Sequence, residues 1–218
     1  MQKTNPFLEE RLTRYDRWLA VGQISFASRV IPVSESLEAE TWVMPSEQVM
    51  AILEEATSIT LTECECRTHY QRCDNPVEVC LVLDDIGDAI VSQGQGHHTS
   101  LDEAAEVVGR ANESGLIHLS LYRPNHHTYA VCSCCSCCCH DLQIVRHFRR
   151  EDLMIRSEYV AETDSTLCIH CGDCIDRCIF QARTRDADGQ VAYEPNACFG
   201  CGLCITTCPA GATRMAPR

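Results

Sequence analysis

The chain has 218 residues and a formal net charge of −13, from 31 acidic and 18 basic side chains. This length predicts one or two domains, and the acidity excludes a role that depends on contact with a nucleic-acid backbone. No apolar run approaches the ~18 residues that a membrane span requires. Because the first residues also lack the apolar core and cleavage site of a secretory signal, we expect a cytoplasmic protein.

Only a few secondary-structure elements are legible along the chain. Apolar residues at helical spacing predict a helix over residues 7–20, and Pro45 opens a second helix. Ser100 begins a capping box and therefore a third helix. Residues 116–122 alternate weakly between apolar and polar side chains, which favours a strand. Cysteines are absent and charges balance around residues 141–163, where we expect a linker.

Eighteen cysteines are the most unusual feature of the composition. In a reducing compartment such residues hold metals or perform redox chemistry, and immediate sequence neighbours are poorly placed for disulfides. They fall into three groups along the chain. The first is Cys64, Cys66, Cys73 and Cys80; the second is Cys132, Cys134, Cys135, Cys137, Cys138 and Cys139; the third is Cys168, Cys171, Cys174, Cys178, Cys198, Cys201, Cys204 and Cys208.

The third group is an internal repeat with an offset of 30 residues. Residues 167–183 read LCIHCGDCIDRCIFQAR and residues 197–213 read ACFGCGLCITTCPAGAT, so every cysteine of one copy coincides with one of the other. Each copy is too small to bury a core alone, and metal–thiolate bonds replace the missing apolar burial. The repeat therefore predicts a small domain folded around inorganic clusters.

Two copies of Cys-x2-Cys-x2-Cys-x3-Cys, the second followed by Pro209, resemble the motif of bacterial two-cluster ferredoxins. In that pattern the fourth cysteine of each copy holds the cluster of the other copy. The resemblance implies two 4Fe–4S clusters with two ligand sets. One set is Cys168, Cys171, Cys174 and Cys208, and the other is Cys198, Cys201, Cys204 and Cys178. Ile179 departs from the usual proline, which loosens one loop but removes no ligand. Zinc is the alternative, which this nested spacing disfavours.

All ten cysteines of the first two groups are candidate ligands of an N-terminal metal centre. Their strings resemble those of uncharacterised iron–sulfur proteins of anaerobes, in which they precede a dicluster ferredoxin domain; that resemblance implies no known activity. If residues 132–139 are extended, three thiols face each side, whereas a helix would place Cys132, Cys135 and Cys139 on one face. Ten thiols suffice for at least one further iron–sulfur cluster, cubane or noncubane. A zinc site that includes His140 is the alternative.

Two other features bear on this N-terminal region. Arg67 follows Cys66 directly, so we expect its charge to offset that of the thiolates. Gly94-x-Gly96 lacks the third glycine and the strand–helix context of a nucleotide-binding loop, and we expect an ordinary loop there. The chain also shows no P-loop and no nicotinamide fingerprint, which leaves no evident place for a hydride carrier.

Together these patterns predict an α+β protein with a mainly helical, cysteine-rich N-terminal domain and a small two-cluster ferredoxin-like C-terminal domain. The expected divisions are a helical segment at 1–44, the cysteine-rich domain at 45–160 and the dicluster domain at 161–218. The leading hypothesis is an electron carrier that relays single electrons through 4Fe–4S clusters, as a subunit or protein partner of a larger redox complex. The alternatives are a reductase, whose atypical N-terminal cluster acts on a disulfide or persulfide, and a redox or oxygen sensor.

Overall fold

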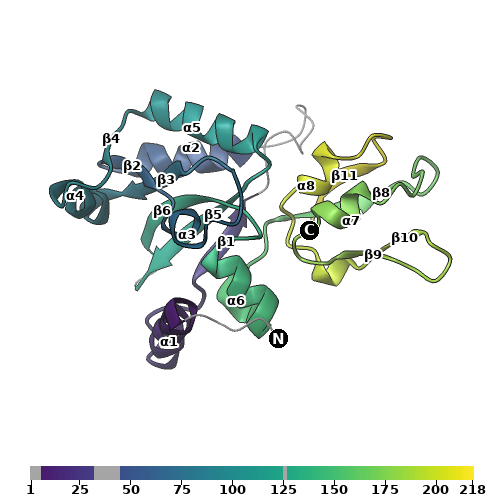
Figure 1. Ribbon diagram of the computed structural model, residues 1–218, viewed down its shortest axis with the longest axis horizontal. Helices are drawn as coiled ribbons and strands as arrows, with labels where there is room; N and C mark the ends of the chain where they lie inside the picture. The colour runs from purple at the N-terminus through teal and green to yellow at the C-terminus, as the bar shows by residue number, and fades with distance from the viewer. Residues whose placement is uncertain (1–5, 32–44, 125–126) are drawn as a thin grey trace.

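The computed structural model describes residues 6–31, 45–124 and 127–218 (Figure 1). Its larger unit is built on a seven-stranded sheet with the strand order β4-β2-β3-β6-β5-β1-β7. The strands are β1 (Ser28–Ile31), β2 (Ile59–Glu63), β3 (Glu78–Leu83), β4 (His97–His98), β5 (Ile117–Arg123), β6 (His127–Cys134) and β7 (Met154–Ile155). The helices are α1 (Pro6–Ala20), α2 (Pro45–Glu55), α3 (Glu65–Tyr70), α4 (Asp84–Ser92), α5 (Leu101–Glu113) and α6 (His140–Phe148), and a 3-10 turn follows at Glu151–Leu153.

The elements predicted from local signals are present. The helix expected at 7–20 is α1, Pro45 opens α2, and the strand expected at 116–122 is β5. Ser100 caps α5, because its hydroxyl oxygen accepts a hydrogen bond from the Glu103 backbone N–H at 3.2 Å. Local periodicity and capping therefore identified three amphipathic helices, and β5 was identified although Ile117–Leu121 is buried throughout.

The linker predicted around residues 141–163 is wrong. Helix α6 begins at His140, and Leu142 and Val145 are buried in the apolar cluster beneath the sheet. Strand β7 then pairs in parallel with β1 at the edge of the sheet. Balanced charge alone does not identify a linker. A helix can bury its apolar face whatever the charges on its exposed face are.

Mixed helix and sheet confirm the α+β class, but the expectation of a mainly helical N-terminal domain missed the sheet. Strand β3 explains why, since every residue of Val79–Leu83 is buried. A strand that is covered on both faces lacks the apolar–polar alternation of a half-exposed strand. The predicted limits at residues 44 and 160 stay a prediction, although β1 pairs with β5 and so shares this sheet.

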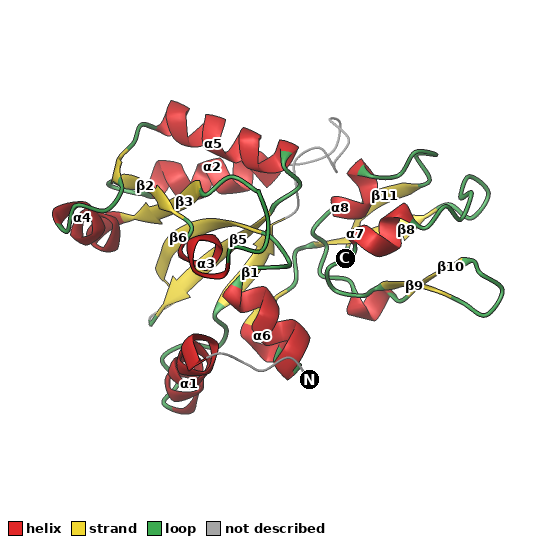
Figure 2. Cartoon of the chain, viewed as in Figure 1, coloured by secondary structure: helices red, strands yellow, loops and turns green. Residues whose placement is uncertain are grey.

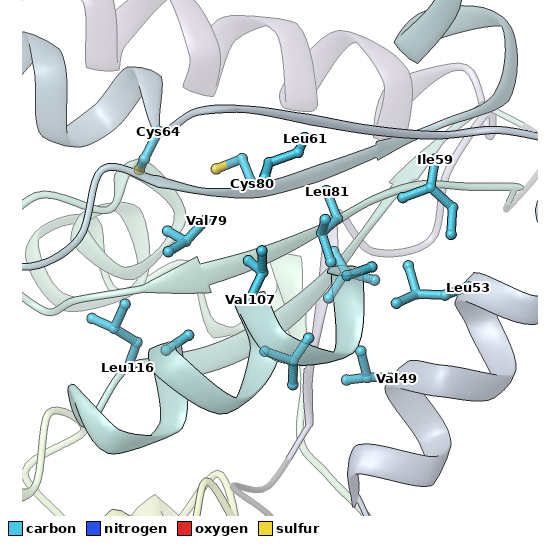
Figure 3. Packing of buried hydrophobic residues seen from close by; sticks show 14 of the residues in the cluster. Val49, Leu53, Ile59, Leu61, Cys64, Val79, Cys80, Leu81, Val107 and Leu116 are labelled. Atoms are coloured by element: carbon cyan, nitrogen blue, oxygen red, sulfur yellow. The ribbon is translucent and has the colours of Figure 1, made fainter. Parts of the chain in front are cut away.

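Helices α2 and α5 cover one face of the sheet (Figure 2). Figure 3 shows that cover at close range: Val79 and Leu81 of β3 pack against Val49, Leu53 and Val107. Alternate residues of β3 point the other way, as the pleat of a strand requires. The opposite face of the sheet is therefore where Cys80 and its neighbours on β6 lie.

The smaller unit contains the C-terminal residues and lies beside the sheet (Figure 1). Its elements are β8 (Tyr159–Thr163), α7 (Asp173–Arg177), β9 (Arg183–Arg185), β10 (Val191–Tyr193), a 3-10 turn (Pro195–Ala197), α8 (Leu203–Thr206) and β11 (Thr213–Pro217). Strand β8 pairs with β11, and β9 pairs with β10. Phe199 and Leu203 of this unit are buried in one apolar cluster with Ile117 and Leu142 of the larger unit, so the two units share a packed interface.

Candidate functional site

The eight cysteines of the smaller unit line two separate cavities. Cys168, Cys171, Cys174 and Cys208 line one of them and form the outer cysteine set. Cys178, Cys198, Cys201 and Cys204 line the other and form the inner cysteine set. In each set the fold brings three cysteines of one sequence copy together with the fourth cysteine of the other copy. Four cysteines around each cavity fit the ligand set of a 4Fe–4S cluster.

Glycines let the backbone of the inner set approach its neighbours closely. Gly202 is the N-cap of α8 and has a φ of 82°, in the left-handed region that favours glycine. At Gly200 a Cβ atom would lie 2.1 Å from the Ser157 hydroxyl oxygen. That hydroxyl donates a hydrogen bond to the Gly200 carbonyl at 2.9 Å, which ties the loop to the start of β8.

The two cysteine sets differ in their access to solvent. In the outer set Cys171 is exposed, and the neighbouring Ile169 is 66% exposed. The inner set faces the larger unit, and burial raises the pKa of the Cys201 thiol above its ordinary value. His170 of the outer loop is half-buried, and its Nδ1 accepts a hydrogen bond from the Val191 backbone N–H at 3.0 Å.

The ten N-terminal cysteines divide into two sets. Four of them form a compact tetrathiol set, in which all sulfur atoms lie within 4.8 Å of one another: Cys73, Cys135, Cys137 and Cys138. The other six line a cavity of about 860 Å³ on the sheet face opposite α2 and α5, which Cys135 of the compact set also borders, and we call these six the thiol ring: Cys64, Cys66, Cys80, Cys132, Cys134 and Cys139. The fold therefore brings all ten predicted ligands into two neighbouring groups.

The end of β6 produces this division. Cys132 and Cys134 are two residues apart on the strand and face the cavity together. The chain then turns over residues 135–138, which sends the thiols of that turn to the compact set, and it returns at Cys139 to the ring. Residues 132–139 are consequently neither wholly extended nor helical, so neither of the two geometries predicted for them holds.

Contacts between neighbouring thiols close the ring. Cys80 and Cys132 are opposite each other on β3 and β6, and their sulfur atoms lie 4.0 Å apart. Cys64 forms hydrogen bonds with Cys66 and Cys80, and the sulfur of Cys80 points toward Cys64 in Figure 3. Interactions that shift the pKa values also link Cys66 with Cys139, Cys139 with Cys134 and Cys134 with Cys132. The six side chains thus line one cavity.

Proton sharing makes the ring thiols alternate in acidity. Hydrogen bonds from neighbouring thiols lower the pKa of three of them, to about 2 for Cys64, to about 6 for Cys139, and well below the ordinary value for Cys132. The same hydrogen bonds raise the pKa of the three thiols between them: Cys66, Cys80 and Cys134. Neighbouring ring thiols thus influence one another's protonation, and binding of a metal ion by them would release protons.

Arg67 lies between the thiol ring and the compact set. Its side chain is 3% exposed, and its Nη2 donates a hydrogen bond to the Ser133 carbonyl at 2.6 Å. The Nε and Nη1 atoms are buried and have no partner among the described residues. Burial lowers the pKa of this guanidinium, but the charges of Cys64 and Cys135 outweigh that effect and raise it. Two unused donors beside these cysteines fit an anionic metal centre, and the charge-offsetting role of Arg67 stays a prediction.

Replacement of Arg67 by glutamine is expected to lower the reduction potential of the N-terminal centre, because a nearby positive charge favours the reduced form. Loss of the hydrogen bond to Ser133 also costs about 1.5–3 kcal/mol of folding free energy. Potentiometric EPR titration measures the shift. Arg123→Gln is the matched control, since that side chain pairs with Asp85 at 2.8 Å on the surface. An equal potential in wild type and Arg67→Gln would contradict the assignment.

Several cavity residues were missed by the sequence analysis. Arg11 of α1 and Asp141 of α6 form an ion pair at 3.2 Å in the cavity wall, and the Tyr15 hydroxyl donates to Asp141 at 2.8 Å. Burial raises the pKa of Tyr129 to about 12, so a protonated phenol also faces the cavity. The position of Asp141, two residues after Cys139, could have indicated that it lies near the cysteines. Nothing in the sequence links α1 to them.

Gly96 lies in a loop, as expected, and His140 lies beside one of the candidate cysteines. The loop that contains Gly96 forms part of the cavity wall, and a Cβ at Gly96 would lie 2.6 Å from the Leu61 carbonyl oxygen. His140 is fully buried, and its Nδ1 lies 3.3 Å from the sulfur of Cys66. Its Nε2 has no partner among the described residues, and burial lowers its pKa to about 4. A neutral imidazole therefore contacts the thiol ring rather than the compact set.

Comparison with known proteins identifies the smaller unit. The 4Fe–4S dicluster domain family matches residues 167–212. An uncharacterized ferredoxin of Methanocaldococcus jannaschii is 32% identical over 57 residues, which cover 25% of this chain and 92% of that protein. Through its C-terminal part, this chain belongs to the ferredoxins with a 4Fe–4S dicluster domain.

Two longer relatives share only part of their length with this chain. The uncharacterized ferredoxin-like protein YdhX of Escherichia coli is 30% identical over 95 residues, which cover 38% of this chain and 43% of the relative. The formate dehydrogenase iron–sulfur subunit of Wolinella succinogenes is 38% identical over 53 residues, which cover 23% of this chain and 26% of the subunit. The chain thus spans less than half the length of both. These similarities support iron–sulfur clusters and an electron-transfer role.

Within the described ranges, no helix combines the length and apolar character needed to cross a membrane.

Proposed function

We propose that this protein takes single electrons from a redox partner at the outer cysteine set and passes them through the inner set to a metal centre in the thiol ring. The outer set would hold one 4Fe–4S cluster and the inner set the other, and each such cluster exchanges one electron at a time. The N-terminal unit would then contain the centre that receives these electrons. This centre distinguishes the chain from a small ferredoxin.

The outer set is the proposed point of entry. Cys171 is exposed, and the apolar side chains of Leu167 and Ile169 beside it are 52% and 66% exposed. Exposed apolar side chains next to a redox centre favour close approach of a protein partner. Iron–sulfur subunits of reductases among the relatives support such a partner, and we therefore place this chain in or beside a larger redox complex.

The observation that carries the proposal is the packing between the inner set and the thiol ring. Cys201 of the inner set and its neighbours Phe199 and Leu203 lie in the same buried cluster as Cys134 and Cys139 of the ring. Phe199 also stacks on Phe180 with ring centroids 4.2 Å apart, which fills the interface with apolar side chains. This apolar packing between the two groups of thiols would form the route for an electron.

The cavity beside the thiol ring favours a second candidate function, the reduction of a small molecule. Its volume of about 860 Å³ lies within the range of about 300–1,000 Å³ found for small-molecule sites. Reduction of a disulfide or persulfide consumes two electrons, which two clusters store together, and two protons. Tyr129 keeps a proton at the cavity wall, and Arg11 provides positive charge for an anionic substrate.

Metal and sulfide analysis of the anaerobically purified protein tests the proposal. We expect more than the eight irons and the eight acid-labile sulfides per chain that two 4Fe–4S clusters contain, because a cluster held by the six ring thiols would add both. The EPR spectrum of the reduced protein should also contain a signal besides those of the two ferredoxin-type clusters. Eight irons per chain and cubane signals alone would contradict a redox centre in the thiol ring.

A further inference from the structure

The compact tetrathiol set differs in geometry from the other cysteine groups of the molecule. Three of its sulfur–sulfur distances are 3.8 Å for Cys73 and Cys135, 3.9 Å for Cys73 and Cys138, and 3.8 Å for Cys137 and Cys138. All four sulfur atoms lie within 4.8 Å of one another. Four thiols from two distant segments thus converge on one small volume.

These distances match a single metal ion. A tetrahedral site with metal–sulfur bonds of about 2.3 Å has sulfur–sulfur edges of about 3.8 Å. A 4Fe–4S cluster holds its thiolates farther apart, because each thiolate binds a different iron at a different corner. The chain supplies its own comparison: among the described residues, neither the outer nor the inner cysteine set forms a group with all sulfur atoms within 4.8 Å.

We propose that Cys73, Cys135, Cys137 and Cys138 bind one metal ion in a tetrahedral tetrathiolate site, separate from the thiol ring. Zinc and ferrous iron share this coordination chemistry. The inference goes beyond the proposed electron-transfer function and does not depend on it. It also divides the ten N-terminal cysteines into four ligands of a single ion and six ligands of the redox centre.

The surroundings of the compact set support four-thiolate binding of a cation. The Asn75 side-chain amide donates a hydrogen bond to the sulfur of Cys73 at 3.4 Å, which stabilises a thiolate. Arg72 donates to the Cys137 carbonyl at 3.1 Å, and Gln143 donates to the Cys138 carbonyl at 2.9 Å. A divalent ion with four thiolates has a charge of −2, and the guanidinium of Arg72 offsets part of it.

A metal site with four protein ligands has no open position, so its role is structural. It would join the loop after α3, which contains Cys73, to the turn that follows β6. That turn lies between Cys134 and Cys139, both of which belong to the thiol ring. The ion would therefore fix the spacing of two ring thiols. His140 takes no part, since its Nδ1 contacts Cys66 of the ring.

X-ray absorption and Mössbauer spectroscopy of the intact, anaerobically purified protein provide the first test. If the ion is zinc, we expect one zinc per chain with four sulfur neighbours at about 2.3 Å and no second metal nearby. If it is iron, we expect one Mössbauer component of a single high-spin iron bound by four sulfurs. Absence of both would overturn the proposal, and this measurement needs no variant.

Two matched variants provide the second test. Cys73→Ala should lose one metal ion per chain and no acid-labile sulfide, because a single ion carries none. Cys132→Ala, its counterpart in the thiol ring, should lose iron and sulfide together and retain the single ion. Loss of several irons with sulfide from Cys73→Ala, with all other clusters intact by EPR, would show that the compact set belongs to a cluster.

Discussion

Cys134→Ser is expected to eliminate electron uptake by the N-terminal centre while both ferredoxin-type clusters remain visible. Cys134 contacts two other ring thiols, Cys132 and Cys139, so its loss opens the ring at one position. The outer and inner cysteine sets contain no N-terminal residue and stay complete. In an anaerobic reductive titration the wild-type chain should accept more than two electrons, and the variant two, one for each 4Fe–4S cluster.

Val131→Ala is the control for this variant. Val131 precedes Cys132 on β6 and is 1% exposed, but it packs on the opposite face of the sheet. Its truncation should cost about 0.5–3 kcal/mol of folding free energy, within the usual range for single substitutions, and leave the electron count unchanged. If Cys134→Ser accepted as many electrons as the wild type, the thiol ring would not be a redox centre.

Cys178→Ala is expected to damage the cluster of the inner set, although Cys178 follows Cys168, Cys171 and Cys174 in sequence. The reason is its position in the cavity lined by the inner set. A cluster left with three thiolates should lose one iron or be lost entirely. EPR of the oxidised variant should show a three-iron signal or the absence of the inner cluster, while the outer cluster retains its spectrum and potential.

Cys208→Ala is the reciprocal control, because Cys208 lies in the other sequence copy but lines the cavity of the outer set. It should damage the outer cluster and spare the inner one. Each variant is thus expected to damage the cluster whose other three ligands come from the other sequence copy. A Cys178→Ala variant with a damaged outer cluster and an intact inner cluster would show that the proposed exchange of the fourth ligand is wrong.

The C-terminal unit was accessible from sequence because its information is local. Residues 168–178 and 198–208 each contain four cysteines at short fixed intervals. The resemblance of this repeat to two-cluster ferredoxins implies which cysteines share a cluster. The same holds for α1 and α5, whose apolar residues recur at helical spacing on one face. In these segments the neighbours along the chain decide the structure.

The thiol ring was not accessible in this way, because its geometry depends on strand pairing. Cys80 meets Cys132 only through the register of β3 against β6, and β3 is too deeply buried to show a clear period. The sequence indicates ten candidate ligands, but their division into six and four follows from a turn after Cys134. Arg11 enters the cavity from a helix that contains no cysteine at all.

The order in which the centres become reduced tests the central claim, that electrons reach the thiol ring through the inner set. Rapid freeze-quench EPR after mixing with a protein electron donor should show the signal of the N-terminal centre only after those of the two ferredoxin-type clusters. In Cys178→Ala that last signal should appear far more slowly. Reduction of the N-terminal centre at the wild-type rate in Cys178→Ala would contradict the account.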